Sequence, residues 1–231
     1  MSKTQTKSDA LRENILDVAT KLFIERGFDG TSFNDIADVV GVTRPALYYY
    51  FKSKEAILEV LTVVVTRAAG DLVSEPLPEN LRQPRAMLRH LVLRHAHLIL
   101  THALQFRVVE RNEENLPPEQ RELAGQSRRA VLAQFRHAIE LGIEQGQFRV
   151  MDPKVAAFSI IGMCNWTAWW FTPAGSRNAE EIAAQIADMA LRSVEQDAGR
   201  QLTEQSAAGV LKLLRDDIDL LERHLGPNLR P

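Results

Sequence analysis

A glycine turn between two short helical segments is the feature that most constrains how this chain can fold. The first segment begins after a cap at Thr31 or Ser32 and carries apolar residues at helical spacing: Phe33, Ile36, Ala37 and Val40. Gly41 ends that segment, and Thr43 caps a second one, RPALYYYF, whose early proline has no N–H group to lose. This arrangement is typical of a helix-turn-helix, whose second helix can enter the DNA major groove.

The whole string TSFNDIADVVGVTRPALYYYFKSKE closely resembles the DNA-binding segment of the TetR family of bacterial transcriptional regulators. The pattern of that family runs from Thr or Ser through Ile-Ala and Gly-Val-Ser/Thr to Leu-Tyr-x-x-Phe and Ser/Asn-Lys-Glu. This chain meets the pattern at Thr31, Ser32, Ile36, Ala37, Gly41, Val42, Thr43, Leu47, Tyr48, Phe51, Ser53, Lys54 and Glu55. The resemblance covers residues 9 to about 58 and is much looser in the rest of the chain.

The resemblance implies, position by position, which residues of the second helix face DNA: Arg44, Pro45, Ala46, Tyr48, Tyr49 and Tyr50. Arg44 suits bidentate reading of a guanine edge, while Pro45 and Ala46 suit contact with a thymine methyl group. Other polar groups are expected to contact phosphates and set the register: the tyrosine hydroxyls, Thr31, Ser32, Thr43 and Lys54. The aromatics cannot all be core, because Leu47 and Phe51 already share the buried face, so at least one tyrosine is exposed.

Composition limits the remaining possibilities. The 231 residues are 45% hydrophobic, which is enough for a substantial core. The net charge is only −2, so DNA affinity must come from a local cluster of positive groups. One cysteine allows neither an internal disulfide nor a thiolate zinc site. Without a signal-like segment or a long apolar run, we expect a cytoplasmic protein with no membrane partner.

Helical periodicity runs through the chain without strand-like alternation. A helix ending before Gly27 precedes the helix-turn-helix, and a fourth helix begins near Lys54 and runs to about Gly70. Further helical patterns span roughly 84–102, 104–114, 118–145, 153–171, 178–198 and 203–225. We therefore expect an all-α fold of about nine to ten helices. Its parts are a three-helix DNA-binding domain over 1–54 and a larger effector-binding and dimerisation domain over 55–231, with an extra C-terminal helix within 197–231.

Two of these helices have the character of a subunit interface. The segment PKVAAFSIIGMCNWTAWWF is apolar nearly all round and must be covered on every side, and the next helix, AEEIAAQIADMALRSV, has a narrower apolar stripe. Two such helices from each of two subunits build a four-helix bundle, the usual dimer interface of the resembled family. A two-fold homodimer would set two recognition helices about 34–36 Å apart, for successive major grooves of a palindromic site.

The three tryptophans of the chain lie on the first of those helices. Trp166, Trp169 and Trp170 share one stripe that Gly162 and Phe158 continue toward the N-terminus. The opposite side carries Ala157, Ile161, Cys164 and Ala168. One side meets the partner subunit and the other the interior of its own subunit, but periodicity does not decide which. The indoles are therefore either ordinary core and interface or the wall of a ligand pocket.

Nearby arginines bear on that choice. Arg107 and Arg111 lie four residues apart on one helix, and Arg128 lies on the next, although solvated surface is the ordinary position of an arginine. With the Asn165-Trp-x-x-Trp-Trp motif, they make the chain similar to a TetR subgroup that answers to fatty-acyl or sterol-derived coenzyme A thioesters and controls lipid catabolism. The resemblance implies an apolar cavity with arginines at its mouth. The expected effector residues are Arg107, Arg111, Arg128, Asn165, Trp166, Trp169 and Trp170.

Other classes of function lack a matching motif. The histidines His90, His95, His97 and His102 divide into two helix faces with a spacing of seven, whereas metal ligands on one helix usually lie three or four apart. Phosphate-binding glycine loops, nucleophile-elbow serines and zinc-protease motifs are missing. We therefore expect no metal, no cofactor and no catalytic residues.

The sequence thus predicts a homodimeric repressor that leaves double-stranded palindromic operator DNA when a small apolar effector, such as an acyl or steroid-derived coenzyme A thioester, binds. Binding among the fifth to eighth helices would move the fourth helix and change the spacing of the recognition helices. Three alternatives stay open. They are a regulator of the efflux type that answers to another hydrophobic compound, a DNA-binding protein with no effector, and an activator.

Overall fold

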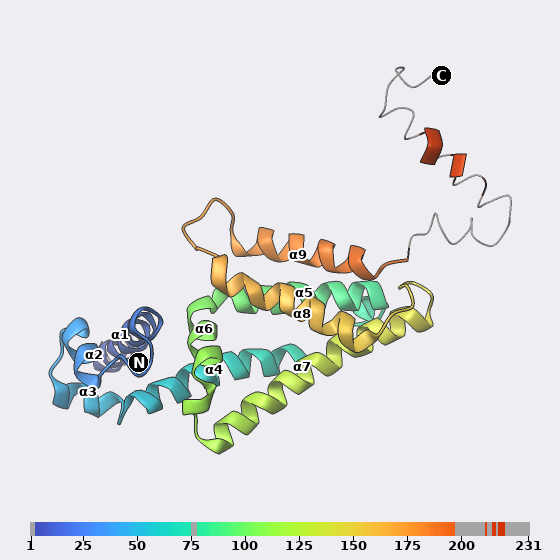
Figure 1. Ribbon diagram of the computed structural model, residues 1–231. Helices are drawn as coiled ribbons and strands as arrows, with labels where there is room; N and C mark the ends of the chain where they lie inside the picture. The colour runs from blue at the N-terminus through green and yellow to red at the C-terminus, as the bar shows by residue number, and fades with distance from the viewer. Residues whose placement is uncertain (1–2, 75–77, 197–210, 212–213, 216, 220–231) are drawn as a thin grey trace, which may run out of the picture.

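The computed structural model describes residues 3–74, 78–196, 211, 214–215 and 217–219 (Figure 1). Over these residues the chain is all-α, as predicted. The helices are α1 (Lys3–Arg26), α2 (Phe33–Val40), α3 (Arg44–Tyr50), α4 (Lys54–Ser74), α5 (Pro84–Thr101), α6 (Ala103–Arg111), α7 (Pro118–Glu144), α8 (Pro153–Trp170) and α9 (Ala179–Val194). The helix predicted over 203–225 falls mostly outside the described residues.

Local hydrogen bonds fix the turn between α2 and α3. Ser32, not Thr31, is the N-cap of α2: its hydroxyl accepts the Asp35 N–H at 3.1 Å, and the Asp35 carboxylate accepts the Ser32 N–H at 2.8 Å. These bonds with Ser32 lower the pKa of Asp35, and the Arg26 charge adds to them against partial desolvation. Gly41 closes α2 with a φ of 79°, a left-handed conformation that costs glycine little. Thr43 caps α3, as expected.

The helix-turn-helix does not have a core of its own. Leu47 of α3 and Ile36 of α2 are fully buried with Ile15 of α1, and the same cluster includes Ile57 of α4 and Val108 of α6. The predicted boundary at residues 54 and 55 therefore runs through a continuous apolar core. Because α4 takes part in this core and continues into the rest of the molecule, it links the two regions mechanically (Figure 1).

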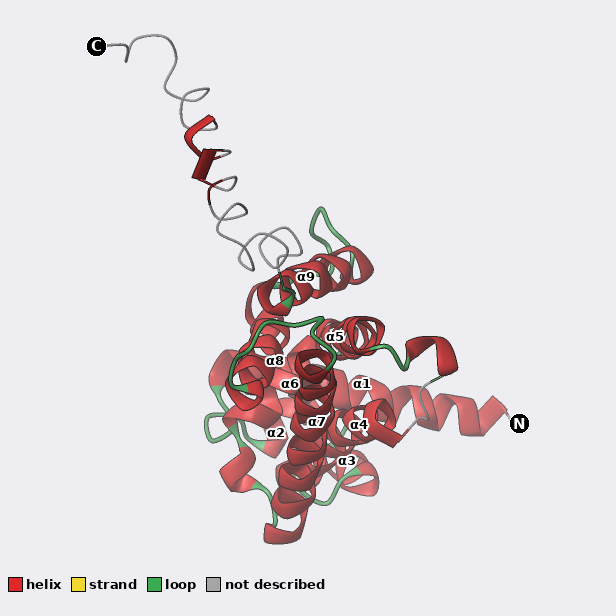
Figure 2. Cartoon of the chain, turned by 90° about the vertical axis from the view of Figure 1, so that its right-hand side faces the viewer, coloured by secondary structure: helices red, strands yellow, loops and turns green. Residues whose placement is uncertain are grey.

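The larger region packs around α5. Leu88 and Val92 of α5 are fully buried against residues of α7, α8 and α9, among them Phe135, Ile160 and Ala187. In two views at right angles, α9 lies outermost, over α5 and α8 (Figures 1 and 2). This arrangement leaves α4, α5, α6, α7 and α8 around a common interior.

The end of α4, the burial of Cys164 and the apolarity of the helices bear on three expectations from the sequence. The fourth helix does not end at Gly70 but continues to Ser74, since one glycine weakens a helix without breaking it. Cys164 is buried, and burial raises the pKa of its thiol to about 12, which makes it an inert apolar residue. No helix among the described residues is long and apolar enough to cross a membrane.

Candidate functional site

The outer face of α3 presents a small polar and aromatic surface. Tyr49 is 81% exposed, which confirms that not all the tyrosines are core, and Arg44, Pro45 and Tyr48 are exposed beside it. Arg44 donates from Nη2 to the Tyr48 hydroxyl at 3.3 Å, and its guanidinium carbon lies 5.6 Å from the centre of the Tyr48 ring. Tyr48 in turn packs on Phe33 with ring centres 4.9 Å apart. The guanidinium is therefore held over α3 before any partner arrives.

Tyr50 and Ala46 lie at the edge of that surface and are half-buried. The Tyr50 hydroxyl accepts a hydrogen bond from Ser8 of α1 at 3.4 Å, and its ring meets that of Tyr49 edge-on at 5.2 Å. Tyr50 thus ties α3 to α1, while Tyr49 projects outward. The hydroxyls of Ser32 and Thr43 accept helix-capping bonds at the surface. The Ser32 O–H also donates to the Asp35 carboxylate at 2.6 Å, whereas the Thr43 O–H can turn toward solvent.

Thr31 and Lys54 have internal partners in place of the predicted phosphate contacts. Thr31 is buried, and its hydroxyl donates to the Gly27 carbonyl at 2.8 Å. The Lys54 ammonium donates to the Phe28 carbonyl at 2.8 Å and lies 4.4 Å from the centre of the Phe28 ring. The carbonyl groups after α1 need donors, and these two side chains supply them. In this conformation both side chains stabilise the turn between α1 and α2.

A cavity of about 270 Å³ lies among α4, α5, α6, α7 and α8. Its wall is mostly apolar and includes Val65, Ala69, Ile99, Phe106, Val109, Val131, Leu132, Phe158 and Ile161. Few polar side chains interrupt it: the uncharged Thr66, His95, Ser127 and Asn165, and the charged Glu110 and Arg128. An apolar cavity with a small number of polar groups is the usual form of a site for a small organic molecule.

His95, which is buried, and Asn165, which is half-buried, form a hydrogen-bonded pair in the cavity wall. The Nε2 of His95 on α5 lies 3.0 Å from Oδ1 of Asn165 on α8. Burial lowers the pKa of His95, and the bond to Asn165 opposes this only in part, so the imidazole is neutral. Its Nδ1 is buried and has no hydrogen-bond partner within the described part of the chain. From the sequence, His95 was considered only as a possible metal ligand. Its position between Leu91 and Ile99 on an apolar stripe nevertheless indicates a side chain that faces the interior.

The second polar group of the cavity consists of Glu110 and Arg128. Arg128 donates to the Glu113 carboxylate at 2.6 Å. Withdrawal from solvent raises the pKa of Glu110; the Arg128 charge opposes this shift, and the Glu113 charge adds to it. Glu110 and Arg128 are exposed and His95 is buried, so the two charged side chains form the rim of the cavity and His95 lies in its interior.

Only two of the seven expected effector residues, Arg128 and Asn165, line the cavity. On α6 the cavity-facing stripe is Phe106, Val109 and Glu110, and Arg107 and Arg111 lie on the adjacent stripe about 100° round the helix. Arg111 is exposed, whereas Arg107 is half-buried and its Nε lacks a partner among the described residues.

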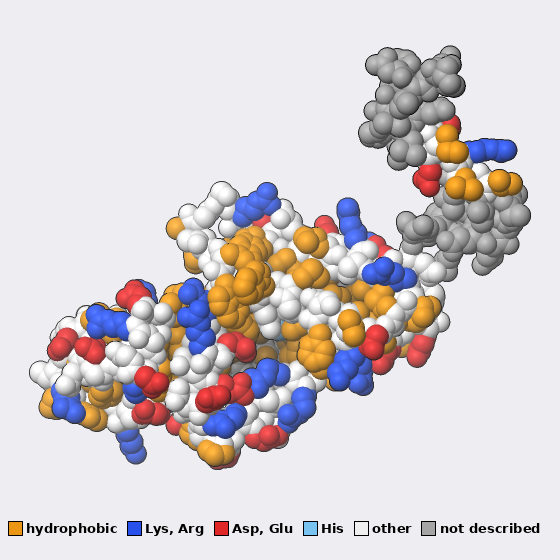
Figure 3. Space-filling model, viewed as in Figure 1, with side chains coloured by type: hydrophobic (Ala, Val, Ile, Leu, Met, Phe, Trp, Pro, Cys, Tyr) orange, Lys and Arg blue, Asp and Glu red, His pale blue; other side chains and the backbone are white. Residues whose placement is uncertain are grey.

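The indoles lie on the outer side of α8. Trp166 and Trp170 are 64% and 52% exposed, and Trp166 stacks on Trp169 with ring centres 5.7 Å apart. Trp169 is half-buried and reaches the cavity only indirectly, through an edge-on contact with Phe106 at 5.9 Å. The stripe that faces the cavity is Phe158, Ile161, Gly162 and Asn165. Exposed apolar side chains gather over α8 and α9, where Figure 3 shows them as an orange patch.

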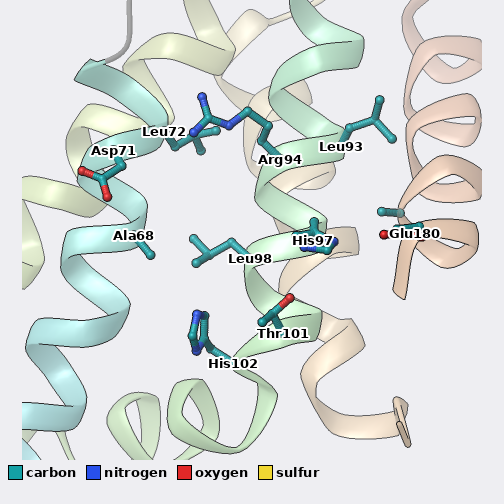
Figure 4. Close-up of a pocket in the computed structure, with 11 residues that line it drawn as sticks. Ala68, Asp71, Leu72, Leu93, Arg94, His97, Leu98, Thr101, His102 and Glu180 are labelled. Carbon is teal, nitrogen blue, oxygen red and sulfur yellow. The ribbon is translucent and has the colours of Figure 1, made fainter. Parts of the chain in front are cut away.

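An outer groove of about 610 Å³ lies between α4, α5 and α9 (Figure 4). Asp71, Arg94, His97, His102 and Glu180 line it, so it is more polar than the cavity. Burial, and then the neighbouring His97, lower the pKa of His102. Leu98 lines both spaces and points from α5 toward α4, so it forms part of the partition between the groove and the cavity.

Two family models match most of the chain. The model described as bacterial regulatory proteins of the tetR family matches residues 15–61. The model described as the tetracyclin repressor-like C-terminal domain matches residues 82–194. The first contains the whole helix-turn-helix, and the second contains α5 to α9, including most of the cavity wall.

Individual relatives agree with these matches. The HTH-type transcriptional repressor KstR2 of Mycolicibacterium smegmatis is 26% identical over 212 residues, which is 85% of this chain and 96% of that protein. The crystal structure of the TetR family regulator PfmR from Thermus thermophilus is 31% identical, covers 79% of this chain and 99% of its own, and has a TM-score of 0.65. The structure of AibR in complex with isovaleryl coenzyme A and operator DNA is 26% identical, covers 78% and 97% of the two chains, and has a TM-score of 0.59.

Proposed function

This chain belongs to the TetR family of DNA-binding transcriptional regulators and is not an enzyme, and from that premise we propose that it is an effector-released repressor. The unliganded homodimer holds a near-palindromic operator and so blocks transcription. A small, largely apolar effector enters the α4–α8 cavity and releases the DNA. Such a regulator acts in the cytoplasm, where its operator lies.

The continuity of α4 carries this proposal. Val65, Thr66 and Ala69 of α4 line the cavity, and Ile57 and Leu58 of the same helix lie in the core of the helix-turn-helix. A ligand that displaces the middle of α4 therefore displaces α3 as well. The ligand changes DNA affinity only by the difference between its affinities for the two positions of α4.

The surface of α3 supplies the DNA contacts in this proposal. Arg44 reads a guanine edge, and Pro45 with Ala46 contacts a thymine methyl group. Tyr48, Tyr49 and the hydroxyl groups of Ser32 and Thr43 contact phosphates, which set the register; Ser32 must exchange its bond to Asp35 for this contact. Tyr50 keeps its bond to Ser8 and positions the helix.

The exposed apolar patch on α8 and α9 forms the dimer interface in this proposal. Trp166, Trp170 and Met189 are each more than half exposed in the single chain. Large apolar patches of this kind usually mark protein contacts, and aromatic side chains contribute most to such contacts. Pairing α8 and α9 with their symmetry mates buries the patch and gives the two-fold symmetry that a palindromic operator requires.

A short acyl coenzyme A thioester is our preferred effector. The cavity volume equals that of about nine waters in the liquid, enough for a short acyl group but not for the whole coenzyme. The charged coenzyme would remain outside, where its phosphates compete with Glu113 for Arg128. The AibR structure, which holds isovaleryl coenzyme A, supports this choice.

A gel-shift assay with the DNA upstream of the gene tests the proposal. We expect the purified chain to bind this DNA and to release it with isovaleryl coenzyme A but not with free coenzyme A or isovalerate. Release by an unrelated hydrophobic compound alone would favour the efflux type of regulator, and no release by any compound would favour a repressor without an effector. A dissociation constant for the effector that is unchanged by operator DNA would refute the coupling through α4.

A further inference from the structure

We propose that His95 and Asn165 recognise an uncharged hydroxyl or carbonyl group on the part of the effector that lies inside the cavity. This inference rests on the proposed function, because it assigns a ligand class to the same cavity. Asn165 makes the contact together with the His95 ring, and the hydrogen bond between the two residues fixes their orientation. Charged groups of the effector stay at the rim.

Among the uncharged polar side chains of the cavity wall His95 is buried, whereas Thr66, Ser127 and Asn165 are half-buried. His95 is 6% exposed, and Leu98, Ile99, Phe106, Val131 and Ile161 are among the residues that surround the same cavity. Leaving a buried polar group without a hydrogen-bond partner is costly, so most such groups in native proteins are satisfied. His95 Nδ1 is an exception among the described residues. A ligand that forms a hydrogen bond with His95 Nδ1 would remove this cost, and would explain why the unpaired nitrogen lies beside a cavity.

The number of free hydrogen-bonding groups does not depend on how the protons are assigned. If His95 donates from Nε2 to Asn165 Oδ1, Nδ1 is left as an acceptor and the Asn165 amide keeps two donor hydrogens. If the amide is turned over, His95 accepts at Nε2 from one amide hydrogen. The His95 Nδ1–H and the other amide hydrogen are then left as donors, with the Asn165 oxygen as an acceptor. Either way the pair keeps at least one donor and one acceptor. A hydroxyl matches both, and a carbonyl matches the donor.

Charge determines what the pair excludes. The imidazole is neutral, so it offers no countercharge to a carboxylate placed beside it. An isolated charge in an apolar interior is far more costly than an uncharged polar group. The nearest charged side chains in the cavity wall are Glu110 and Arg128, and both belong to the rim. An anionic group is therefore stable near Arg128, whereas the interior requires an uncharged group.

Four probes of similar size separate these possibilities: cyclohexanol, cyclohexanone, methylcyclohexane and cyclohexanecarboxylate. Each is titrated into the full chain without DNA, and binding is followed by tryptophan fluorescence, since Trp169 touches Phe106 of the cavity wall. We expect cyclohexanol to bind about tenfold more tightly than methylcyclohexane, which corresponds to one buried hydrogen bond. Cyclohexanone should fall between them, and cyclohexanecarboxylate should bind most weakly. Equal affinity for cyclohexanol and methylcyclohexane, or a preference for the carboxylate, would overturn the inference.

Variants then assign the preference to the pair. Asn165→Leu keeps the approximate size of the side chain and should reduce the preference for cyclohexanol over methylcyclohexane to about threefold or less. His95→Phe should reduce it in part, and His95→Gln, which can still bond to Asn165, should restore it. Val155→Ala is the control on the same helix: Val155 is exposed and lies outside the cavity wall, so this variant should leave the preference unchanged. A wild-type preference in Asn165→Leu would overturn the inference.

The readouts keep this inference apart from the proposed function. The ranking of the four probes is measured on the wild-type chain without DNA, so it does not depend on any variant folding or on operator release. If the preference is present but no metabolite releases DNA, the proposed function fails and the assignment of His95 and Asn165 stands. If release occurs but the probes bind equally, only the assignment fails.

Discussion

The surface of α3 and the cavity among α4 to α8 are built in opposite ways. The α3 surface comes from one helix of seven residues, capped by Thr43 and resting on Leu47. The cavity wall comes from five helices and runs in sequence from Val65 to Asn165. The caps and the turn that shape the first come from neighbours within four positions, whereas the second is shaped throughout by the packing of distant segments. Substitutions should therefore act sharply and locally at α3, and by degrees at the cavity.

Leu47→Ala is the most severe test of the α3 surface. Leu47 is fully buried beneath the exposed tyrosines, and removing its side chain should lower the free energy of unfolding by about 2–5 kcal/mol. Urea unfolding followed by circular dichroism measures this. Tyr49→Ala, two positions away and exposed, is the control and should change the same quantity by about 0.5 kcal/mol or less. A small effect of Leu47→Ala would mean that α3 does not depend on this core.

Trp166→Ala tests whether the outer side of α8 belongs to the cavity or to the dimer. We expect the dimer to weaken by about 2 kcal/mol or more, roughly thirtyfold, as for other buried aromatic contacts between proteins. Sedimentation equilibrium measures the change. Val150, which is 91% exposed outside α8 and α9, supplies the control Val150→Ala. An unchanged dimer with a lost effector response would assign Trp166 to the cavity after all.

Arg44→Ala tests how the α3 surface reads sequence. Loss of a bidentate guanine contact should weaken operator binding by about 1–3 kcal/mol, and should relax the preference for that base pair. Fluorescence anisotropy with the operator and a single-base variant measures both. Arg136→Ala, which removes only a surface ion pair with Glu140 on α7, should change neither. An equal loss on all DNA sequences would make Arg44 a phosphate contact.

The same contrast explains what the sequence could predict. The caps at Ser32 and Thr43, the turn at Gly41 and the burial of Leu47 follow from residues a few positions apart, so the helix-turn-helix was predictable in detail. The all-α architecture and most helix bounds follow from periodicity alone. Nothing in the local pattern indicated that Lys54 would bind the Phe28 carbonyl, because that bond joins the ends of two helices.

The cavity was predictable only in part, for a geometric reason. Periodicity groups Trp166, Trp169 and Trp170 on one stripe of α8, but it does not say which neighbour covers the stripe. The structure turns Asn165 inward and the adjacent indoles outward. The partner of His95 lies 70 positions along the chain, so no local pattern could pair the two residues.

Leu98→Ala tests the partition between the cavity and the outer groove. Removing this half-buried side chain should join the two spaces. The affinity for a larger ligand, such as 4-tert-butylcyclohexanol, divided by the affinity for cyclohexanol should then be roughly tenfold higher than in the wild type. Fluorescence titration measures the ratio of affinities. Leu93 lines the groove but not the cavity, so the control Leu93→Ala should leave the ratio unchanged. The same change in both variants would mean that Leu98 separates nothing.

The two regions should also differ in their response to acid. Burial lowers the pKa of His95 from its ordinary 6.5, so the unfolded chain takes up this proton first. The stability that the neutral ring contributes is fully present above pH 6.5 and is lost as the pH falls from there toward the folded pKa. The pKa of Asp35 in the helix-turn-helix is also lowered, from 3.8, so its contribution is present above pH 3.8 and is lost only below it. Mild acid should therefore weaken the cavity region before it affects the α2 cap.

Melting temperatures of the wild type, His95→Gln and Asp35→Asn across this range measure the smallest of these effects. His95→Gln keeps a bond to Asn165 but cannot be protonated, so the wild type should lose stability relative to it as the pH falls below 6.5. His102 has the same sign of pKa shift but is present in all three proteins and cancels in the comparison. The gap between the wild type and Asp35→Asn should stay constant until the pH nears 3.8. A difference in melting temperature between the wild type and His95→Gln that does not change with pH would mean that the buried ring is protonated as readily as in the unfolded chain. The cavity interior would then be more polar than the residues of its wall indicate.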